Sequence, residues 1–415
     1  MRRANNQDAH VVLLAEDEHV WRQRGHIFMV ADGMGAHAAG ELASKIAVDN
    51  VPHLYHHYRD LSPPEALQNA FVEGNSEIHK RGIANADFRA MGTTGSALVL
   101  LPQGALIGHV GDSRVYRLRQ GQLEQLTFDH SLQWELRSMG SLPEDSELAR
   151  SIPKNVITRS LGPNAEVVVD IEGYFPLEVG DTFLLCSDGL TGQLKDDEIG
   201  SLLAYLPPDE AIATLVDLAN LRGGPDNITV LIVKVTGEEL ISSVPAESDG
   251  DSGGRSRRGG GNPAAWVVSG ICLLLAFFLW FAELHAPAVL SAVAGVVSLM
   301  VGVVLWIRSR QRSGSSGAPS DRFGNGPYVQ VRCAASDEFA RTLAATFSEL
   351  RQATEEEQWE IEWSSCDEQQ RNAEAACQAG DHSRAVRHYA QAISSMMAEL
   401  RQVQKRKASD SSIEY

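Results

Sequence analysis

The sequence predicts an α+β domain followed by two long apolar helices and a helical tail. Short apolar runs that end at an aspartate, such as "HIFMVADG" at 26–33 and "FLLCSDG" at 183–189, are typical of buried strands that stop at a turn. Two uncharged stretches follow at 263–282 and 288–307, and apolar residues recur at helical spacing over 336–407. A chain of 415 residues is too long for one hydrophobic core, so we expect two or more domains.

The first of these aspartates, Asp32, lies where a predicted strand meets a predicted helix. Gly33 allows the chain to turn after the strand, and an amphipathic helix pattern begins at Glu41. A carboxylate beside exposed backbone carbonyls suits a hard cation such as Mg²⁺ or Mn²⁺, which prefers oxygen ligands. Taken alone, however, an Asp-Gly pair more often marks an ordinary turn.

Three further acidic positions repeat this arrangement. Asp112 ends the apolar run "ALIGHVGDS", Asp188 ends "FLLCSDG", and Asp226 stands just before the run "ITVLIV". Four carboxylates at strand ends can meet only if the strands are neighbours, and like charges placed together repel unless cations bind them. The sequence therefore predicts a divalent metal site, in which bound cations would offset the repulsion between these carboxylates.

The composition excludes some classes of function. The net charge is −18, and most of the acidic excess lies in residues 1–240, whereas nucleic-acid binding requires a basic face. The five cysteines are scattered without metal-type spacing, which favours a reduced, cytosolic setting. None of them begins a phosphate-binding Cys-x5-Arg loop, so the sequence does not predict a thiolate nucleophile.

A linker and two apolar segments follow the first domain, which we place at 1–240. Residues 241–262 are rich in Ser, Gly, Asp and Arg, which predicts a flexible linker. The runs at 263–282 and 288–307 are long enough to span a bilayer, and arginines flank the pair on both outer sides but not in the joint between them. We expect a two-helix transmembrane hairpin and a multi-pass protein of the inner membrane, with both flanking regions cytoplasmic. The alternative is a buried helical hairpin in a soluble domain.

After a basic flank and linker at 308–335, the tail at 336–407 has a helical pattern. Ser336 is suited to cap the first helix, and the stretch "AEAACQAGDHSRAVRHYAQAI" has small or apolar residues at helical spacing on both sides of Gly380. This stretch resembles a single tetratricopeptide-type helical hairpin, which would bind a protein partner. A helical bundle or coiled coil with no specific partner is the alternative.

In chain order, the motifs of roughly the first 236 residues resemble those of the metal-dependent protein phosphatases, the PPM or type 2C serine/threonine phosphatase family, in its bacterial form. The matching stretches are "RRANNQD" (2–8), "FMVADGMG" (28–35), "MGTTGSALVLL" (91–101), "IGHVGDSRVYRL" (107–118), "LTFDHSL" (126–132), "NVITRSLG" (155–162), "GDTFLLCSDGL" (180–190) and "GGPDNITVLIVKV" (223–235). The resemblance implies a four-layer α/β/β/α sandwich of two antiparallel sheets, with a metal centre in the cleft between the sheets.

The resemblance also implies a set of metal ligands. Two central Mn²⁺ or Mg²⁺ ions and a third, weaker ion would be held by five carboxylates and one backbone carbonyl: Asp8, Asp32, Gly33, Asp112, Asp188 and Asp226. Asp8 would act through bound water, and Asp112 would share the third ion with Asp188. Two divalent ions can lower the pKa of a water held between them and hold the phosphate oxygens, so hydrolysis needs no nucleophilic side chain.

Two further residues are candidates for catalysis. Arg3 resembles the phosphate-binding arginine of the family, and its forked cation suits a phosphate. The position of the general-acid histidine proposed for eukaryotic members is Met34 here, which leaves His37 as the substitute. Residues 127–161 resemble the mobile flap of bacterial members, a segment that varies and influences substrate choice.

The sequence therefore predicts an active phosphoserine and phosphothreonine phosphatase, tethered to the membrane, that opposes a serine/threonine kinase. Its expected partners are phosphorylated proteins and a protein bound by the C-terminal helices. The alternative is a catalytically silent membrane scaffold that keeps the fold to bind phosphoproteins. The retained aspartates favour the enzyme, because a scaffold gains nothing from clustered carboxylates.

Overall fold

The structure is a computed structural model that describes residues 5–36, 38–140, 152, 156–238, 323–359 and 361–411. The chain divides into two compact units, of which one comprises Met1–Val244 with Arg322–Tyr415 and the other Pro245–Asp321. The second unit lies outside the described residues, and so do Arg3, His37 and the predicted linker at 241–262.

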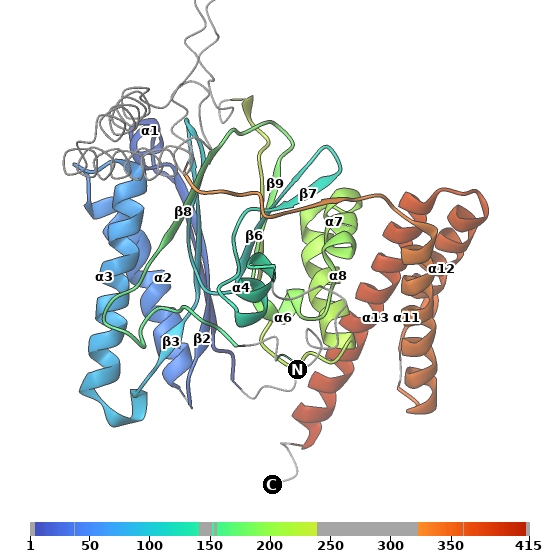
Figure 1. Ribbon diagram of the computed structural model, residues 1–415. Helices are drawn as coiled ribbons and strands as arrows, with labels where there is room; N and C mark the ends of the chain where they lie inside the picture. The colour runs from blue at the N-terminus through green and yellow to red at the C-terminus, as the bar shows by residue number, and fades with distance from the viewer. Residues whose placement is uncertain are drawn as a thin grey trace, which may run out of the picture. The chain divides into compact units, whose positions relative to one another are not determined.

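Two antiparallel sheets form the centre of the first unit (Figure 1). In the described residues the first sheet has the order β1-β2-β4-β5-β8, with β3 beside β2. Its strands are β1 (Asp8–Leu13), β2 (His26–Met34), β3 (Gly92–Thr93), β4 (Gly95–Leu101), β5 (Gly104–Val110) and β8 (Asp170–Phe175). The second sheet has the order β10-β9-β6-β7-β11. Its strands are β6 (Arg114–Arg119), β7 (Gln122–Gln125), β9 (Thr182–Cys186), β10 (Val230–Lys234) and β11 (Val329–Arg332).

Helices cover both outer faces of this pair of sheets. The first sheet packs on α2 (Ala39–His57) and α3 (Pro63–Ala84), and the second on α7 (Asp196–Tyr205) and α8 (Pro208–Leu221). The short elements are α1 (Glu18–Arg24), the 3₁₀ helix η1 (Ala86–Phe88), α4 (Leu132–Ser138) and α6 (Asp188–Thr191). The predicted α+β fold of two antiparallel sheets with flanking helices is confirmed.

The central strands of the first sheet are buried on both faces. Every residue of β4 and β5 is buried, because α3 covers one face and the second sheet covers the other. The core between the sheets includes Phe28, Leu98 and Phe183. Burial on both faces explains why "GSALVLL" and "GALIGHV" read as nearly continuous apolar runs rather than alternating ones.

The C-terminal region begins with an edge strand that the sequence did not predict. Strand β11 pairs antiparallel with β7 and extends the second sheet. Its side chains alternate between half-buried Val329 and Val331 and exposed Gln330 and Arg332, which is the pattern of a strand with one covered face. We expected these residues in a linker, because four residues are too few to carry a clear periodic signal.

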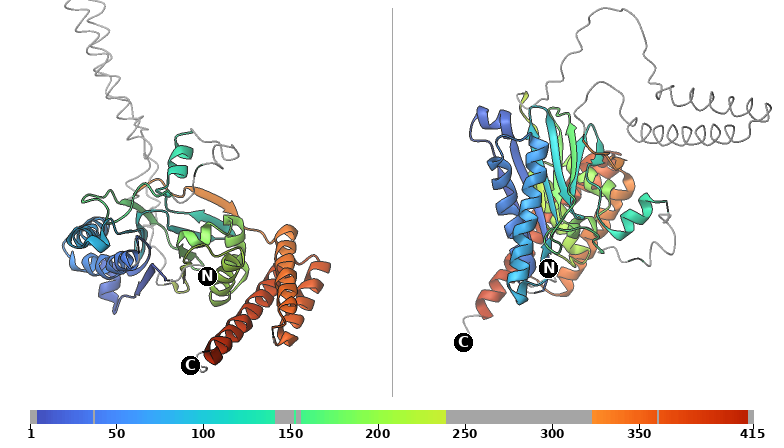
Figure 2. Two further views of the ribbon diagram at one scale, coloured as in Figure 1. Left: turned by 90° about the horizontal axis from the view of Figure 1, so that it is seen from below. Right: turned by 60° about the vertical axis from the view of Figure 1, so that its left-hand side comes forward.

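Three helices follow and share a core with the first domain. They are α11 (Asp337–Glu356), α12 (Trp363–Gln378) and α13 (His382–Ser411), so the predicted helical tail is confirmed. Helices α12 and α13 form a hairpin at Gly380, whose φ of 74° favours glycine. Helix α13 packs against α8, and one apolar core contains residues of both, such as Leu215 and Ile393 (Figure 2). The tail therefore forms a further layer on the α7–α8 face.

The predicted multi-pass membrane location is contradicted in the part of the chain that the structure describes. None of the helices there is both long enough and apolar enough to cross a bilayer. The longest, α13, has 30 residues but carries charged side chains along its length. The two apolar segments at 263–282 and 288–307 lie outside the described residues.

Candidate active site

Asp32 lies near the end of β2, opposite Asp8 in the register of β1 and β2. Its backbone is held on both sides: the Asp32 N–H donates to Thr94 Oγ1 at 2.8 Å, and the Asp32 carbonyl accepts from Thr94 N at 2.8 Å and Thr93 Oγ1 at 2.9 Å. These bonds fix the direction in which the Asp32 carboxylate leaves the strand.

Asp8 connects the two sheets. Its Oδ2 accepts hydrogen bonds from Ser187 Oγ at 2.8 Å and Thr229 Oγ1 at 2.7 Å, which flank β9 and β10 of the second sheet. Its Oδ1 is buried and has no hydrogen-bond partner among the described residues. Burial raises the pKa of Asp8, and these hydrogen bonds lower it only in part. One oxygen of this carboxylate is therefore fixed, and the other remains able to accept from a ligand.

Asp188 and Asp226 lie at adjacent strand ends of the second sheet, as the sequence predicted. Asp188 begins α6 just after β9, Asp226 precedes β10, and the two strands pair antiparallel. Beside Asp226, the Asn227 side chain accepts from the Gln7 backbone N–H at 3.0 Å and donates to the Asn5 carbonyl at 3.2 Å. The N-terminal segment is thereby tied to the end of the second sheet.

The carboxylates surround Asp32. Burial raises the pKa of Asp32 well above its usual range, and the negative charges of four other side chains raise it further: Asp8, Asp188, Asp112 and Asp226. The structure therefore brings together all five predicted aspartates. Their mutual repulsion is the electrostatic condition that bound cations relieve.

Two glycines let the backbones approach closely at this site. A Cβ atom at Gly33 would lie less than 3.0 Å from the carbonyl oxygens of Gly40 and Gln7. At Gly189 it would meet the carbonyl oxygen of Asn227 at a similarly forbidden distance. Glycine is therefore required at both positions by the space available.

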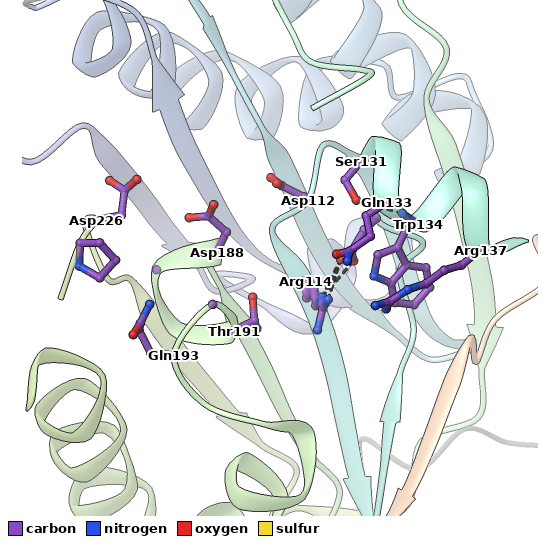
Figure 3. A pocket seen from close by; sticks show the side chains of 14 residues that line it. Asp112, Arg114, Ser131, Gln133, Trp134, Arg137, Asp188, Thr191, Gln193 and Asp226 are labelled. Atoms are coloured by element: carbon purple, nitrogen blue, oxygen red, sulfur yellow. Dashed lines mark hydrogen bonds and ion pairs between the residues drawn. The ribbon is translucent and has the colours of Figure 1, made fainter. Parts of the chain in front are cut away.

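Asp112 opens onto a cleft beside the carboxylates. The cleft has a volume of about 490 Å³, and its lining includes Asp112, Asp188 and Asp226 (Figure 3). Burial, followed by the charges of Asp188 and Asp129, raises the pKa of Asp112 to about 7. Its Oδ1 is buried with no hydrogen-bond partner in the described residues.

The opposite wall of the cleft carries two cations, Arg114 from β6 and Arg137 from α4 (Figure 3). Arg114 is held in place, because it forms a two-pronged pair with Asp129 and its guanidinium lies 5.5 Å from the centre of the Trp134 ring. Arg137 also lines the cleft, and its buried Nε has no hydrogen-bond partner among the described residues. Because Arg137 lines the cleft, its guanidinium is placed to bind an anion that enters there.

Comparison with known proteins identifies this arrangement. Residues 2–209 match the family model described as protein phosphatase 2C. The chain belongs to the protein phosphatase 2C family. The phosphatase is 36% identical over 255 residues to protein phosphatase PhpP of Streptococcus pneumoniae, a match that covers 57% of this chain and 95% of the relative. It is therefore a protein serine/threonine phosphatase, as predicted.

A solved structure gives the same result. The S. agalactiae serine/threonine phosphatase is 35% identical, with a TM-score of 0.50 and coverage of 57% of this chain and 95% of that one. The catalytic domain of the serine/threonine protein phosphatase PstP, solved in complex with two manganese ions, is 32% identical, with a TM-score of 0.47 and coverage of 57% and 94%. Phosphatases of this family use Mn²⁺ or Mg²⁺, which agrees with the predicted cofactors.

The residues present in the phosphatase fit such ions. The donors are all oxygens, and Asp8 and Asp112 each keep a buried oxygen without a hydrogen-bond partner in the described residues. Among those residues, no three His, Cys, Asp or Glu side chains lie close enough to hold one ion together.

Several residues that support the site were not predicted. Ser187, Thr229 and Asn227 adjoin the metal motifs, and polar residues beside a motif aspartate were the signal that could have found them. Nothing in the sequence singled out Trp134 or Arg137 within the flap pattern. The structure describes only part of that flap, because 141–151 and 153–155 lie outside the described residues.

Proposed function

We propose that the phosphatase hydrolyses phosphoserine and phosphothreonine in proteins by direct attack of a metal-activated water. The observation that carries this proposal is the group of five buried or partly buried aspartates formed by Asp32 and the four others around it. When bound, divalent ions supply an activated water and neutralise the phosphate oxygens. The protein then needs only to hold the ions, bind the phosphorylated segment and exclude other water.

The residues of this chain divide those tasks. We assign the two central ions to Asp32, Asp188, Asp226 and the Gly33 carbonyl, with Asp8 acting through water. The position of Asp112, with its unpartnered Oδ1 at the cleft, supports a third ion there.

Arg3 and His37 remain proposals for phosphate binding and proton donation, and both lie outside the described residues. On the described side of the cleft, Arg137 and Trp134 form the wall that a phosphorylated segment would contact. The partners that follow from this function are phosphorylated proteins and a serine/threonine kinase that makes them. We also propose a protein partner for the C-terminal helices, since α12 keeps a largely exposed face.

The test uses the full chain with matched phosphopeptides that differ only in carrying phosphoserine, phosphothreonine or phosphotyrosine. Phosphate release should occur with the first two, stop with EDTA and return with Mn²⁺. Tight binding of the phosphoserine peptide without any phosphate release, at any Mn²⁺ concentration, would support the scaffold alternative instead.

A further inference from the structure

The C-terminal region supplies partners to buried carboxylates of the phosphatase domain. Glu172 of β8 is buried, and its hydrogen-bond partners include the Gly326 N–H at 3.0 Å and the Tyr328 hydroxyl. On the other side of the second sheet, Asp217 of α8 is buried and pairs with Arg401 of α13. A buried carboxylate that loses its partner is strongly destabilising. These contacts therefore make the C-terminal region part of the folded phosphatase unit.

The segment around Tyr328 also reaches the wall of the catalytic cleft. The ring of Tyr328 lies edge-on to Phe128 with 5.4 Å between centres, and Phe128 lies edge-on to Trp134 at the same distance. Trp134 lines the cleft and carries the guanidinium of Arg114 over its ring. Three aromatic rings thus connect the C-terminal segment to the cleft.

A hydrogen-bonded path runs beside these rings. The Tyr328 N–H donates to the Gln125 carbonyl at 2.8 Å, just before β11 pairs with β7. The Gln125 side chain donates to Asp129 Oδ1 at 2.8 Å, and Asp129 holds Arg114. Both paths start at Tyr328 and end at residues that line the cleft.

We infer that Tyr328 is a positioning residue for the phosphatase reaction. Its ring holds Phe128 and, through Phe128, the position of Trp134 on the substrate-facing wall. Its hydroxyl has a separate role, which is to form a hydrogen bond with the buried Glu172 carboxylate. The C-terminal segment therefore shapes the part of the cleft that receives the phosphorylated chain. This inference rests on the proposed function of the cleft.

The two tasks of Tyr328 can be separated in the full chain with Mn²⁺. Tyr328→Phe keeps the ring and removes the hydroxyl, whereas Tyr328→Ala removes both. We expect both variants to lower the thermal midpoint of unfolding, because Glu172 loses a partner. Only Tyr328→Ala should raise KM for a phosphopeptide. This rise should exceed the change in KM for a small aryl phosphate by roughly 2- to 10-fold, as the loss of one aromatic contact implies.

A double-mutant cycle tests whether Tyr328 acts on Trp134 through the ring of Phe128. If Tyr328 acts through Phe128, the KM effects of Tyr328→Ala and Phe128→Ala should not multiply in the double variant. Full multiplication would overturn the aromatic route. Unchanged KM in Tyr328→Ala, or an equal rise in Tyr328→Phe, would overturn the positioning role altogether.

Tyr205 provides a matched control. Its hydroxyl accepts from the Ala335 N–H at 3.3 Å, so it contacts the same C-terminal segment, but from α7. Tyr205→Ala should lower the unfolding midpoint without raising KM for the phosphopeptide. A KM rise in this variant equal to that of Tyr328→Ala would overturn the inference, because any loosening of the segment would then suffice. A wild-type chain that releases no phosphate would instead count against the proposed function.

Discussion

At the scale of single residues, the site depends on carboxylates that are costly to bury. Asp188 follows β9 and lines the cleft, and its negative charge raises the pKa of both Asp32 and Asp112. Asp188→Asn removes a charge from the proposed ligand set but keeps the shape of the side chain. We expect phosphate release to fall by at least about 100-fold, with an unchanged circular dichroism spectrum. Near-native turnover of this variant at saturating Mn²⁺ would contradict the assignment.

The raised pKa of Asp112 predicts a pH dependence of stability. Its folded pKa is about 7 without metal, above the value of 3.8 for a free side chain. A raised carboxyl pKa contributes stability below about pH 4, and this contribution is lost as the pH rises toward 7 and beyond. In EDTA, the wild-type chain should therefore lose more stability between pH 5 and pH 8 than Asp112→Asn does. Thermal unfolding of both proteins at the two pH values measures this difference, and equal losses would contradict it.

The same residue predicts a pH dependence of Mn²⁺ binding. A metal must displace the proton of Asp112, so the affinity of that site should fall as the pH drops through about 7. Titration calorimetry at pH 8 and pH 6 should show weaker binding at the lower pH. In Asp112→Asn the weakest binding event should be absent at both values. A weak site that persists in this variant would place the third ion elsewhere.

Arg137 predicts a preference among substrates. It lines the cleft, so its guanidinium is placed to pair with an acidic side chain near the phosphorylated residue. Arg137→Ala should reduce the ratio of kcat/KM for an acidic-flanked over a neutral-flanked phosphopeptide by roughly 10- to 100-fold, as expected for the loss of a charge-assisted hydrogen bond. Arg81→Ala, at an exposed position of α3, is the control. An unchanged ratio in Arg137→Ala would exclude this role.

At the scale of elements, the turn after Asp32 requires close contact between β2 and α2. A Cβ at Gly33 would collide with the carbonyl of Gly40 in the first turn of that helix. We expect Gly33→Ala to displace the turn, lower the unfolding midpoint and reduce activity by more than about 10-fold, since small displacements of catalytic groups have large kinetic costs. Gly82→Ala in α3 is the milder comparison, because a Cβ there would lie 3.2 Å from the Phe88 carbonyl oxygen, whereas at Gly33 it would lie 2.1 Å from that of Gly40. Equal effects of the two substitutions would contradict the steric argument.

At the scale of the whole molecule, the C-terminal helices cover an apolar face that would otherwise be exposed. Leu215 and Leu218 of α8 lie in one core with Val386 and Ile393 of α13. A chain that ends at residue 240 would expose this face and would lack Arg401, the ion-pair partner of Asp217. We expect this truncation to bind a hydrophobic dye and to unfold at a lower temperature, because the apolar side chains of α8 lose the helix that covers them. A truncated domain as stable as the full chain would contradict this view of the tail.

Local patterns of the sequence determined a large part of this protein. Asp32 and Asp188 could be located because apolar runs and Asp-Gly turns mark strand ends within a few residues, and the helical tail because its apolar spacing repeats over many turns. The order of the motifs then indicated the family. Each of these signals is contained in a short stretch of chain.

Only the tertiary structure decided which of these pieces meet. Thr229 and Asp8 are 221 positions apart, Tyr328 and Glu172 are 156 apart, and nothing within either short stretch specifies its partner. The same holds for β11, whose four residues become a strand because the open edge of β7 offers hydrogen bonds to them. Local propensity sets where elements form, whereas shared burial and hydrogen bonding across the fold set which residues line the cleft and which helices cover its supporting sheet.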